Sequence, residues 1–173
     1  MSQEQVNLDV LLEEKDMFDF NFYHTYHSKN GWFAIIFGVA AVVAAVVTYG
    51  SVTRAYTTIY VLIGFMMLIY EPYAIYANSK RQMKLSEVLQ NTLHYAINSE
   101  GVMVTTDVEV EGGENSVLLP WKQVYKVVHT KKDLFIFSNR TNAYIIPNRY
   151  TDENWKVLEK IIVRNVDDFR RKL

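Results

Sequence analysis

Residues 32–49 read WFAIIFGVAAVVAAVVTY, a run of 18 residues without one ionisable side chain. At about 1.5 Å rise per residue, a helix of this length spans about 27 Å, close to the roughly 30 Å hydrocarbon core of a bilayer. A second apolar run starts at residue 55 and reaches residue 77, with a kink expected near Pro72. The pattern predicts a transmembrane hairpin over residues 31–78, with spans at 32–49 and 55–77.

Composition limits the classes of protein that the rest of the chain can belong to. After the two spans, the 173 residues leave room for one small soluble domain. A formal net charge of −1 argues against a nucleic-acid binder, which usually carries a basic excess. The absence of cysteine excludes disulfides, thiolate nucleophiles and cysteine-ligated metals. The acidic, aromatic first 30 residues do not fit a cleavable signal peptide.

Charge on the two sides of the hairpin predicts its orientation. The loop of residues 50–54 is too short to be a domain, so both termini should lie on one side of the membrane. That side carries four basic residues near the spans, against Arg54 alone in the loop; the four are Lys29, Lys80, Arg81 and Lys84. The positive-inside rule then places both termini in the cytoplasm. We expect a multi-pass protein of the inner (cytoplasmic) membrane.

Two features of the spans are candidates for a specific role. Gly38, Ala41 and Ala45 have the spacing of a small-residue face, which lets a neighbouring backbone approach closely. Packing against the second span of the same chain is one interpretation, and a homodimer is the other. Glu71 is an ionisable residue near membrane depth, which favours a functional role, but it also fits a solvated carboxylate at the membrane border.

The part of the chain after the hairpin, residues 79–173, has the pattern of a bent antiparallel sheet closed by a helix. A helical pattern over 82–90 gives way to strand-like runs at 93–97, 102–104, 108–110, 116–119, 122–130, 133–138 and 142–146. Gly112 and Gly113 are typical of a hairpin turn. Thr151 is a suitable N-cap for a last helix whose apolar face would hold Trp155, Leu158, Ile162, Val166 and Phe169, with Arg170, Arg171 and Lys172 in its last turn. This is a pleckstrin-homology-like architecture.

The N-terminal residues 1–30 are expected to be ordered. Val6, Leu8, Val10 and Leu12 alternate with polar residues, as in a half-buried strand. We expect residues 5–12 to pair with the C-terminal sheet and residues 13–27 to form a membrane-proximal helix. The predicted fold is therefore an α+β membrane protein in which the hairpin is inserted near the front of a pleckstrin-homology-like domain.

Three stretches carry a resemblance to a known family. Residues 119–127 (LPWKQVYKV), 134–137 (LFIF) and 143–149 (AYIIPNR) closely resemble the YcxB-like family of bacterial membrane proteins. The resemblance implies a short N-terminal segment, two adjacent transmembrane helices and a C-terminal domain similar to bacterial pleckstrin-homology domains. It implies no agreed activity.

No catalytic signature is found in the sequence. It has no glycine-rich phosphate loop, nucleophile elbow or H-E-x-x-H motif. His24 and His27 lie three apart, with Asp16 and Asp19 upstream, but two interfacial histidines explain this as well as a metal site does. We expect no enzyme, no metal and no cofactor.

A candidate interaction surface lies in the sheet domain; its members are Trp121, Lys122, Tyr125, Lys126, Arg140 and Arg149. Trp121 and Tyr125 are four apart on one predicted strand and would share a face. We expect Trp121 to pack in the core under Trp155, with a partner-binding surface as the alternative. The basic residues could bind anionic headgroups, each contributing about 1 kcal/mol near such a surface, or form a solvated sheet face.

Three hypotheses of function follow. The first is a non-enzymatic, membrane-anchored module that binds a protein or peptide partner at the cytoplasmic face. The second is an immunity protein against a membrane-active toxin or bacteriocin, for which neighbouring genes would be the discriminating observation. The third is a sensor of anionic lipid headgroups. In each the lipid bilayer is a partner and nucleic acid is not.

Overall fold

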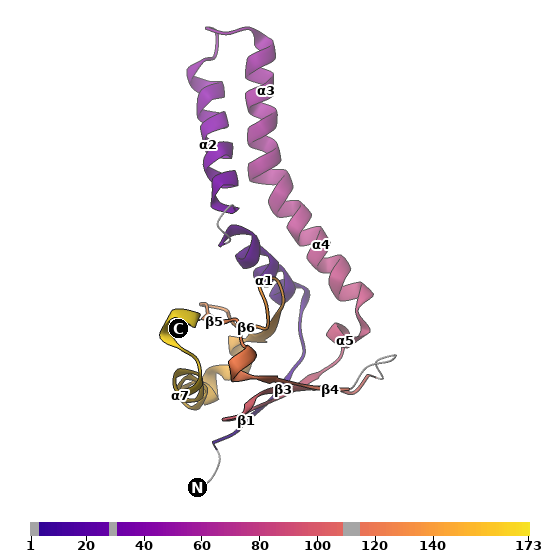
Figure 1. Ribbon diagram of the computed structural model, residues 1–173. Helices are drawn as coiled ribbons and strands as arrows, with labels where there is room; N and C mark the ends of the chain where they lie inside the picture. Colours follow the sequence, from indigo (N-terminus) through magenta and orange to yellow (C-terminus); the bar gives the residue numbers. More distant parts are fainter. Residues whose placement is uncertain (1–3, 28–30, 109–114) are drawn as a thin grey trace. The chain divides into compact units, whose positions relative to one another are not determined.

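The computed structural model describes residues 4–27, 31–108 and 115–173 (Figure 1). The chain divides into two compact units. One, here called the sheet unit, consists of Met1–Met17 and Gln82–Leu173; the other, the helical unit, is Phe18–Arg81. The helical unit is thus an insertion in the sequence of the sheet unit, and the first boundary falls after residue 17 instead of residue 30.

The helical unit is built from long helices, of which the first and last continue into the sheet unit. In chain order they are α1 (Glu14–Tyr26), α2 (Gly31–Val47), α3 (Arg54–Phe65), the π-helical turn η1 (Met66–Tyr70) and α4 (Glu71–Leu85). The last three form one helix of 32 residues, Arg54–Leu85. Among the described residues, this helix is long and apolar enough to cross a membrane, and α1 with α2 counts as a second such segment if the pair is one broken span.

Local chemistry explains where these helices end or bend. The helix α2 stops at Val47, two residues before the predicted end, and Gly50 follows with φ of +80°, a left-handed conformation that glycine tolerates best. The kink expected near Pro72 takes the form of the π-helical turn, in which the Glu71 N–H donates to the Met66 carbonyl. The wider turn makes room for a proline ring that lacks an N–H and would clash with the preceding turn.

The sheet unit contains two four-stranded sheets. The first has the order β1 (Val6–Val10), β2 (Leu93–Ile97), β3 (Gly101–Thr106), β4 (Ser116–Pro120), and all its neighbours are antiparallel. The second has the order β7 (Ala143–Pro147), β6 (Asp133–Phe137), β5 (Lys126–His129), β8 (Arg171–Lys172), with β8 parallel to β5. The predicted pairing of the N-terminal strand is confirmed, since Val6 lies opposite Ile97 and Val10 opposite Leu93.

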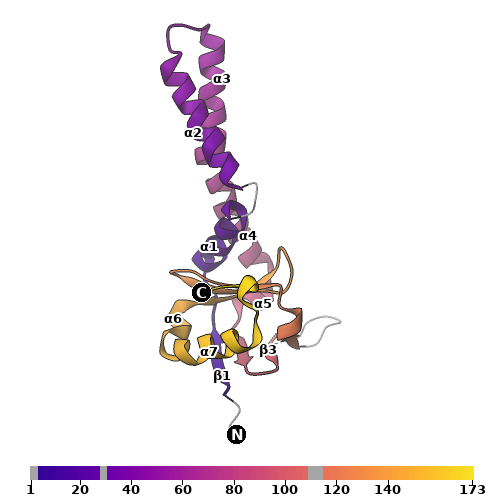
Figure 2. The ribbon, with the colours of Figure 1, turned by 60° about the vertical axis from the view of Figure 1, so that its left-hand side comes forward.

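The core of this unit lies between the sheets and the helix α7 (Trp155–Asn165), which lies beside the strands in Figure 2. All five residues of the central strand β6 are buried, as its continuous apolar run predicts. Tyr95 of β2 meets Tyr144 of β7 edge to face at 6.1 Å between ring centroids. The helix adds Leu158, Ile161 and Ile162. The two sheets and α7 therefore share one core.

Several predicted boundaries before β6 are corrected. The helical pattern over 82–90 is interrupted at Ser86, whose hydroxyl caps the short helix α5 (Glu87–Gln90) by accepting the Leu89 N–H. The predicted strand 122–130 begins only at Lys126, because the 3-10 turn η2 (Trp121–Gln123) follows Pro120. Residues 109–110 of the strand predicted at 108–110, and the turn at Gly112 and Gly113, lie outside the described residues.

The closing helix is shorter than predicted at both ends. Thr151 is not its N-cap: it is buried in the short helix α6 (Asn148–Thr151), where its hydroxyl donates to the Asn148 carbonyl. The 3-10 turn η3 (Asp152–Asn154) leads into α7, which ends at Asn165 because Val166 is extended. The basic residues predicted for its last turn lie instead in the 3-10 turn η4 (Asp168–Arg170) and in β8.

Candidate functional site

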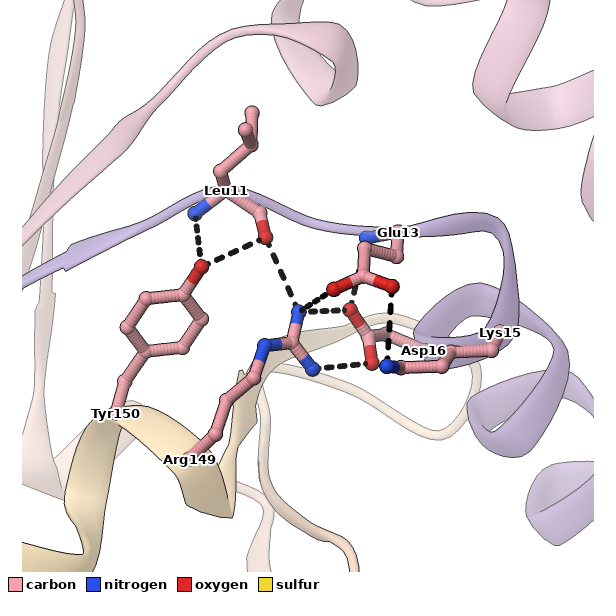
Figure 3. A network of polar contacts seen from close by, with 6 residues as sticks. All are labelled: Leu11, Glu13, Lys15, Asp16, Arg149 and Tyr150. Atoms are coloured by element: carbon pink, nitrogen blue, oxygen red, sulfur yellow. Dashed lines mark hydrogen bonds and ion pairs between the residues drawn. The ribbon is translucent and has the colours of Figure 1, made fainter.

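Arg149, in α6 directly after β7, is the centre of a polar network that reaches the start of α1 (Figure 3). Its Nη1 donates to Asp16 Oδ1 at 2.8 Å and its Nη2 to Asp16 Oδ2 at 2.6 Å, the bidentate geometry of a strong ion pair. Asp16 is only 2% exposed, and its Oδ2 also accepts the Glu13 N–H at 2.8 Å. The buried carboxylate thus caps α1 and holds Arg149.

The same network holds the end of the N-terminal strand segment. Arg149 Nη2 donates to the Leu11 carbonyl at 3.2 Å and lies 3.3 Å from Glu13 Oε1. The Tyr150 hydroxyl donates to the same Leu11 carbonyl and accepts the Leu11 N–H. The hydrogen bond to Asp16 raises the pKa of Arg149, which keeps the guanidinium charged. Arg149, predicted as part of an interaction surface, is therefore tied into the sheet unit.

The predicted small-residue face of α2 packs within the chain. Gly38, Ala41 and Ala45 are the buried residues of this helix. A Cβ on Gly38 would lie 2.8 Å from the Leu68 side chain, and a Cβ on Gly64 of α3 would lie 2.6 Å from a Val42 methyl. The face thus packs against the second apolar segment of the same chain, which is the first of the two interpretations; the homodimer stays a prediction. The sequence did not lead us to Gly64 as a packing residue, although a glycine inside the second apolar run indicates a possible close helix contact.

The two ends of the helical unit lie side by side. Asn21 Nδ2 of α1 donates to the Ser79 hydroxyl of α4 at 2.9 Å, and that hydroxyl donates to the Ile75 carbonyl. The rings of Phe18 and Tyr76 meet edge to face at 6.0 Å. Both connections to the sheet unit therefore leave from the same end of this helix group. Glu71 is half-buried, and its backbone completes the π-helical turn.

Trp121 and Tyr125 do not share a face. Trp121 is 4% exposed and its Nε1–H donates to the Asn98 carbonyl at 2.8 Å, so it belongs to the core. Tyr125 is 46% exposed. The prediction of a shared strand face is wrong because the 3-10 turn at Trp121 breaks the two-residue alternation. Trp155, the expected ring partner, stacks on His129 with centroids 3.8 Å apart.

The remaining candidates are basic. Lys122 and Arg140 are exposed, on η2 and in the β6–β7 turn. Lys126 is half-buried at the start of β5, with Nζ 4.2 Å from the centroid of the Phe137 ring, and burial lowers its pKa. Lys122, Tyr125 and Lys126 are thus close in the sequence and reach the surface.

His94, on β2, bridges two carboxylates. His94 Nδ1 lies 2.6 Å from Asp9 Oδ1, and its Nε2 lies 3.2 Å from Asp107 Oδ2. The bond to Asp9, and then that to Asp107, raise the pKa of His94. This link joins β1 to β2 and to the end of β3. Sequence alone could not predict the contact between His94 and Asp9, because the two residues lie 85 positions apart.

Comparison with known proteins gives one family match. Neither the curated proteins nor the solved structures contain a significant match to this chain. Residues 98–161 match the family model described as YcxB-like protein. This range runs from the turn before β3 into α7 and includes all three stretches that suggested the resemblance. Over residues 98–161 the chain is similar to the YcxB-like protein family, which confirms the predicted resemblance.

Proposed function

We propose that this chain is a non-enzymatic interaction module, anchored in a bilayer by its helical unit, that binds a protein or peptide partner through its sheet unit. The observation that carries the anchor is the outward exposure of large apolar side chains on α2 and α3, among them Phe37, Val43, Val46, Ile59, Leu62 and Phe65. Apolar surface in water costs about 25 cal/mol per Å². An extended apolar surface of this kind favours contact with lipid.

The polar groups of these helices support the same proposal. The hydroxyls of Thr48, Thr58 and Ser79 each donate to a carbonyl four residues back in their own helix. Polar groups at membrane depth have no water to bind and must find partners inside the protein. These three hydroxyls meet that requirement.

Orientation follows from charge and from the position of the helix ends. Because α1 and α4 are hydrogen bonded at Asn21 and Ser79, both connections leave the helical unit on one side. Lys80, Arg81 and Lys84 lie on that side and Arg54 on the other; Lys29 lies outside the described residues. The positive-inside rule favours a cytoplasmic sheet unit.

The sheet unit supports a binding role. Two four-stranded sheets with a packed C-terminal helix are the layout expected of a pleckstrin-homology-like domain, which we propose as its fold. A fold does not by itself define a function, which depends on the residues that the fold presents. Of the predicted candidates, Lys122, Tyr125 and Arg140 are exposed and Lys126 is half-buried.

The absence of cysteine in the sequence allows a clean test of anchor and orientation. Ser51, in the loop between α2 and α3, and Ser99, in the β2–β3 turn, are both exposed. In bacterial cells, we expect Ser51→Cys to react with an impermeant maleimide from outside and Ser99→Cys to react only after permeabilisation. Both proteins should stay in the membrane after alkaline carbonate washing. Reversed labelling would overturn the orientation, and release by carbonate would overturn the anchor.

A further inference from the structure

Two aromatic side chains stand exposed in the segments that lead into β5 and β8 of the second sheet. Phe169 is 85% exposed and Tyr125 is 46% exposed. The parallel pair β5–β8 sets Arg171 opposite Val127, so Phe169 and Tyr125 each lie two residues before this paired position. Phe169 lies in the 3-10 turn just before β8 and Tyr125 just before β5, and Arg170, next to Phe169, donates to the carbonyl of Val124, next to Tyr125. The two aromatics therefore lie in segments that are in contact.

The segment that carries Phe169 is held firmly in place. Arg170 Nη1 donates to the Val124 carbonyl at 2.9 Å, and its guanidinium lies 5.8 Å from the Phe169 ring centroid. Arg171 Nη1 donates to the carbonyls of Val163 and Val166 at 2.7 and 2.6 Å. The exposed ring is thus presented by a segment that is hydrogen bonded on both sides to the sheet unit.

The charge around the two rings is positive. Within three positions of Tyr125 or Phe169 along the chain there are five basic residues and two carboxylates: Lys122, Lys126, Arg170, Arg171 and Lys172 against Asp167 and Asp168. Both carboxylates form ion pairs inside the segment, Asp167 with Arg170 and Asp168 with Arg171. The surface as a whole therefore complements a negatively charged partner.

We propose that Phe169, Tyr125 and the basic residues around them bind an acidic segment of a protein partner that carries an apolar side chain. The inference rests on the proposed function, for which it names the binding surface and the chemistry of the partner. The rings would cover the apolar side chain, and the basic residues would pair with the flanking carboxylates. A peptide can contact the lysines and avoid Asp168, whereas a flat anionic bilayer would meet this carboxylate, 88% exposed, beside Phe169.

The test uses the full chain in phosphatidylglycerol nanodiscs, panned against a phage-displayed library of short random peptides. The Phe169→Ser chain serves for counter-selection; since Phe169 is already exposed, this substitution removes little packing. We expect enriched peptides with Asp or Glu on both sides of an apolar residue. A synthetic copy should bind at least about tenfold more weakly to Phe169→Ser and Tyr125→Ser, and more weakly in high salt. Met103→Ser, at an exposed apolar position on β3, is the matched control and should leave binding unchanged.

Three results would overturn the proposal: no enrichment over the Phe169→Ser chain, enriched peptides without acidic residues, or unchanged binding by both aromatic variants.

A separate measurement tests whether the bilayer, instead of a peptide, occupies this surface. A bimane dye on Phe169→Cys that is quenched by spin-labelled lipid would assign the ring to the membrane and also overturn the proposal. If the chain resists carbonate extraction but selects no acidic peptide, the anchor stands and this surface fails. If carbonate releases a chain that still selects acidic peptides, the surface stands and the anchor fails.

Discussion

The helical unit and the sheet unit use the same apolar residue types in opposite ways. In the helical unit, Phe37 and Val46 are 60% and 71% exposed; in the sheet unit, Phe137 and Val127 are fully buried. The sheet unit is stabilised by removing such groups from water. In the helical unit the small residues face the protein and the large ones face out, which is the arrangement expected where the solvent is itself apolar and helices associate by close packing.

The comparison predicts the largest effect in the sheet unit. Trp121→Ala removes a buried side chain and should lower the free energy of unfolding by about 3–5 kcal/mol, much of the roughly 5–15 kcal/mol that holds a typical domain together. Trp121→Phe, which loses the hydrogen bond to the Asn98 carbonyl, should cost about 1–3 kcal/mol. Protease resistance of residues 92–173 in the full chain, measured against denaturant, gives these values.

Tyr125→Ala is the control for this substitution, because it truncates an exposed aromatic four residues away and should stay within about 0.5 kcal/mol of wild type. Equal losses for Trp121→Ala and Tyr125→Ala would contradict the placement of Trp121 in the core.

The next effect is expected at the ion pair between Asp16 and Arg149 inside the sheet unit. Arg149→Met leaves the Asp16 carboxylate buried without its bidentate partner and should lower the free energy of unfolding by about 3 kcal/mol. This is the low end for a broken buried ion pair, because the Arg149 side chain is 32% exposed. The double variant Asp16→Leu with Arg149→Met should recover part of this loss, since no charge remains buried. The unfolding midpoint of the sheet unit is the measurement. No recovery in the double variant would show that the hydrogen bonds to Leu11, and not the buried charge, determine the loss.

A smaller effect is expected inside the helical unit. Gly64→Leu forces a side chain into the space of the Val42 methyl and should cost about 1–3 kcal/mol through overpacking. Thermal stability of the detergent-solubilised protein, followed by helical circular dichroism, is a suitable measurement. Val43→Leu, on the outward side of α2, is the control and should leave the thermal stability unchanged. If both substitutions destabilise the protein equally, α2 and α3 do not pack as described.

The smallest effect concerns the pH dependence of the sheet unit. Because the folded-state pKa of His94 is raised, chiefly by Asp9, its stabilising contribution is complete below the unfolded value of about 6.5 and is lost as pH rises through the folded value. We expect the unfolding midpoint to fall over this pH window in wild type. In His94→Gln this part of the slope should disappear. A wild-type slope that survives in His94→Gln would assign the titration to another group.

The sequence located most elements because their signals are local. The alternation of Val6, Leu8 and Val10 identified β1 and even its partner, since a half-buried strand needs a sheet edge and one sheet was available. The apolar run of β6 and the small residues of α2 were found in the same way. The similarity to the YcxB-like family covers residues 98–161 and points to no particular site.

The sequence by itself determined the two apolar helical segments, the strand-rich domain and the place of the N-terminal strand. Only the tertiary structure decided that the Trp121 indole donates to the Asn98 carbonyl, that Arg149 pairs with Asp16 across 133 positions, and that Phe169 stands outside the last helix. The spacing of Phe169 still fits a helix, yet α7 ends at Asn165, where the chain turns back to pair Arg171 with Val127 of β5. Periodicity reports which face of an element is apolar, whereas contacts between distant residues depend on how the chain closes on itself.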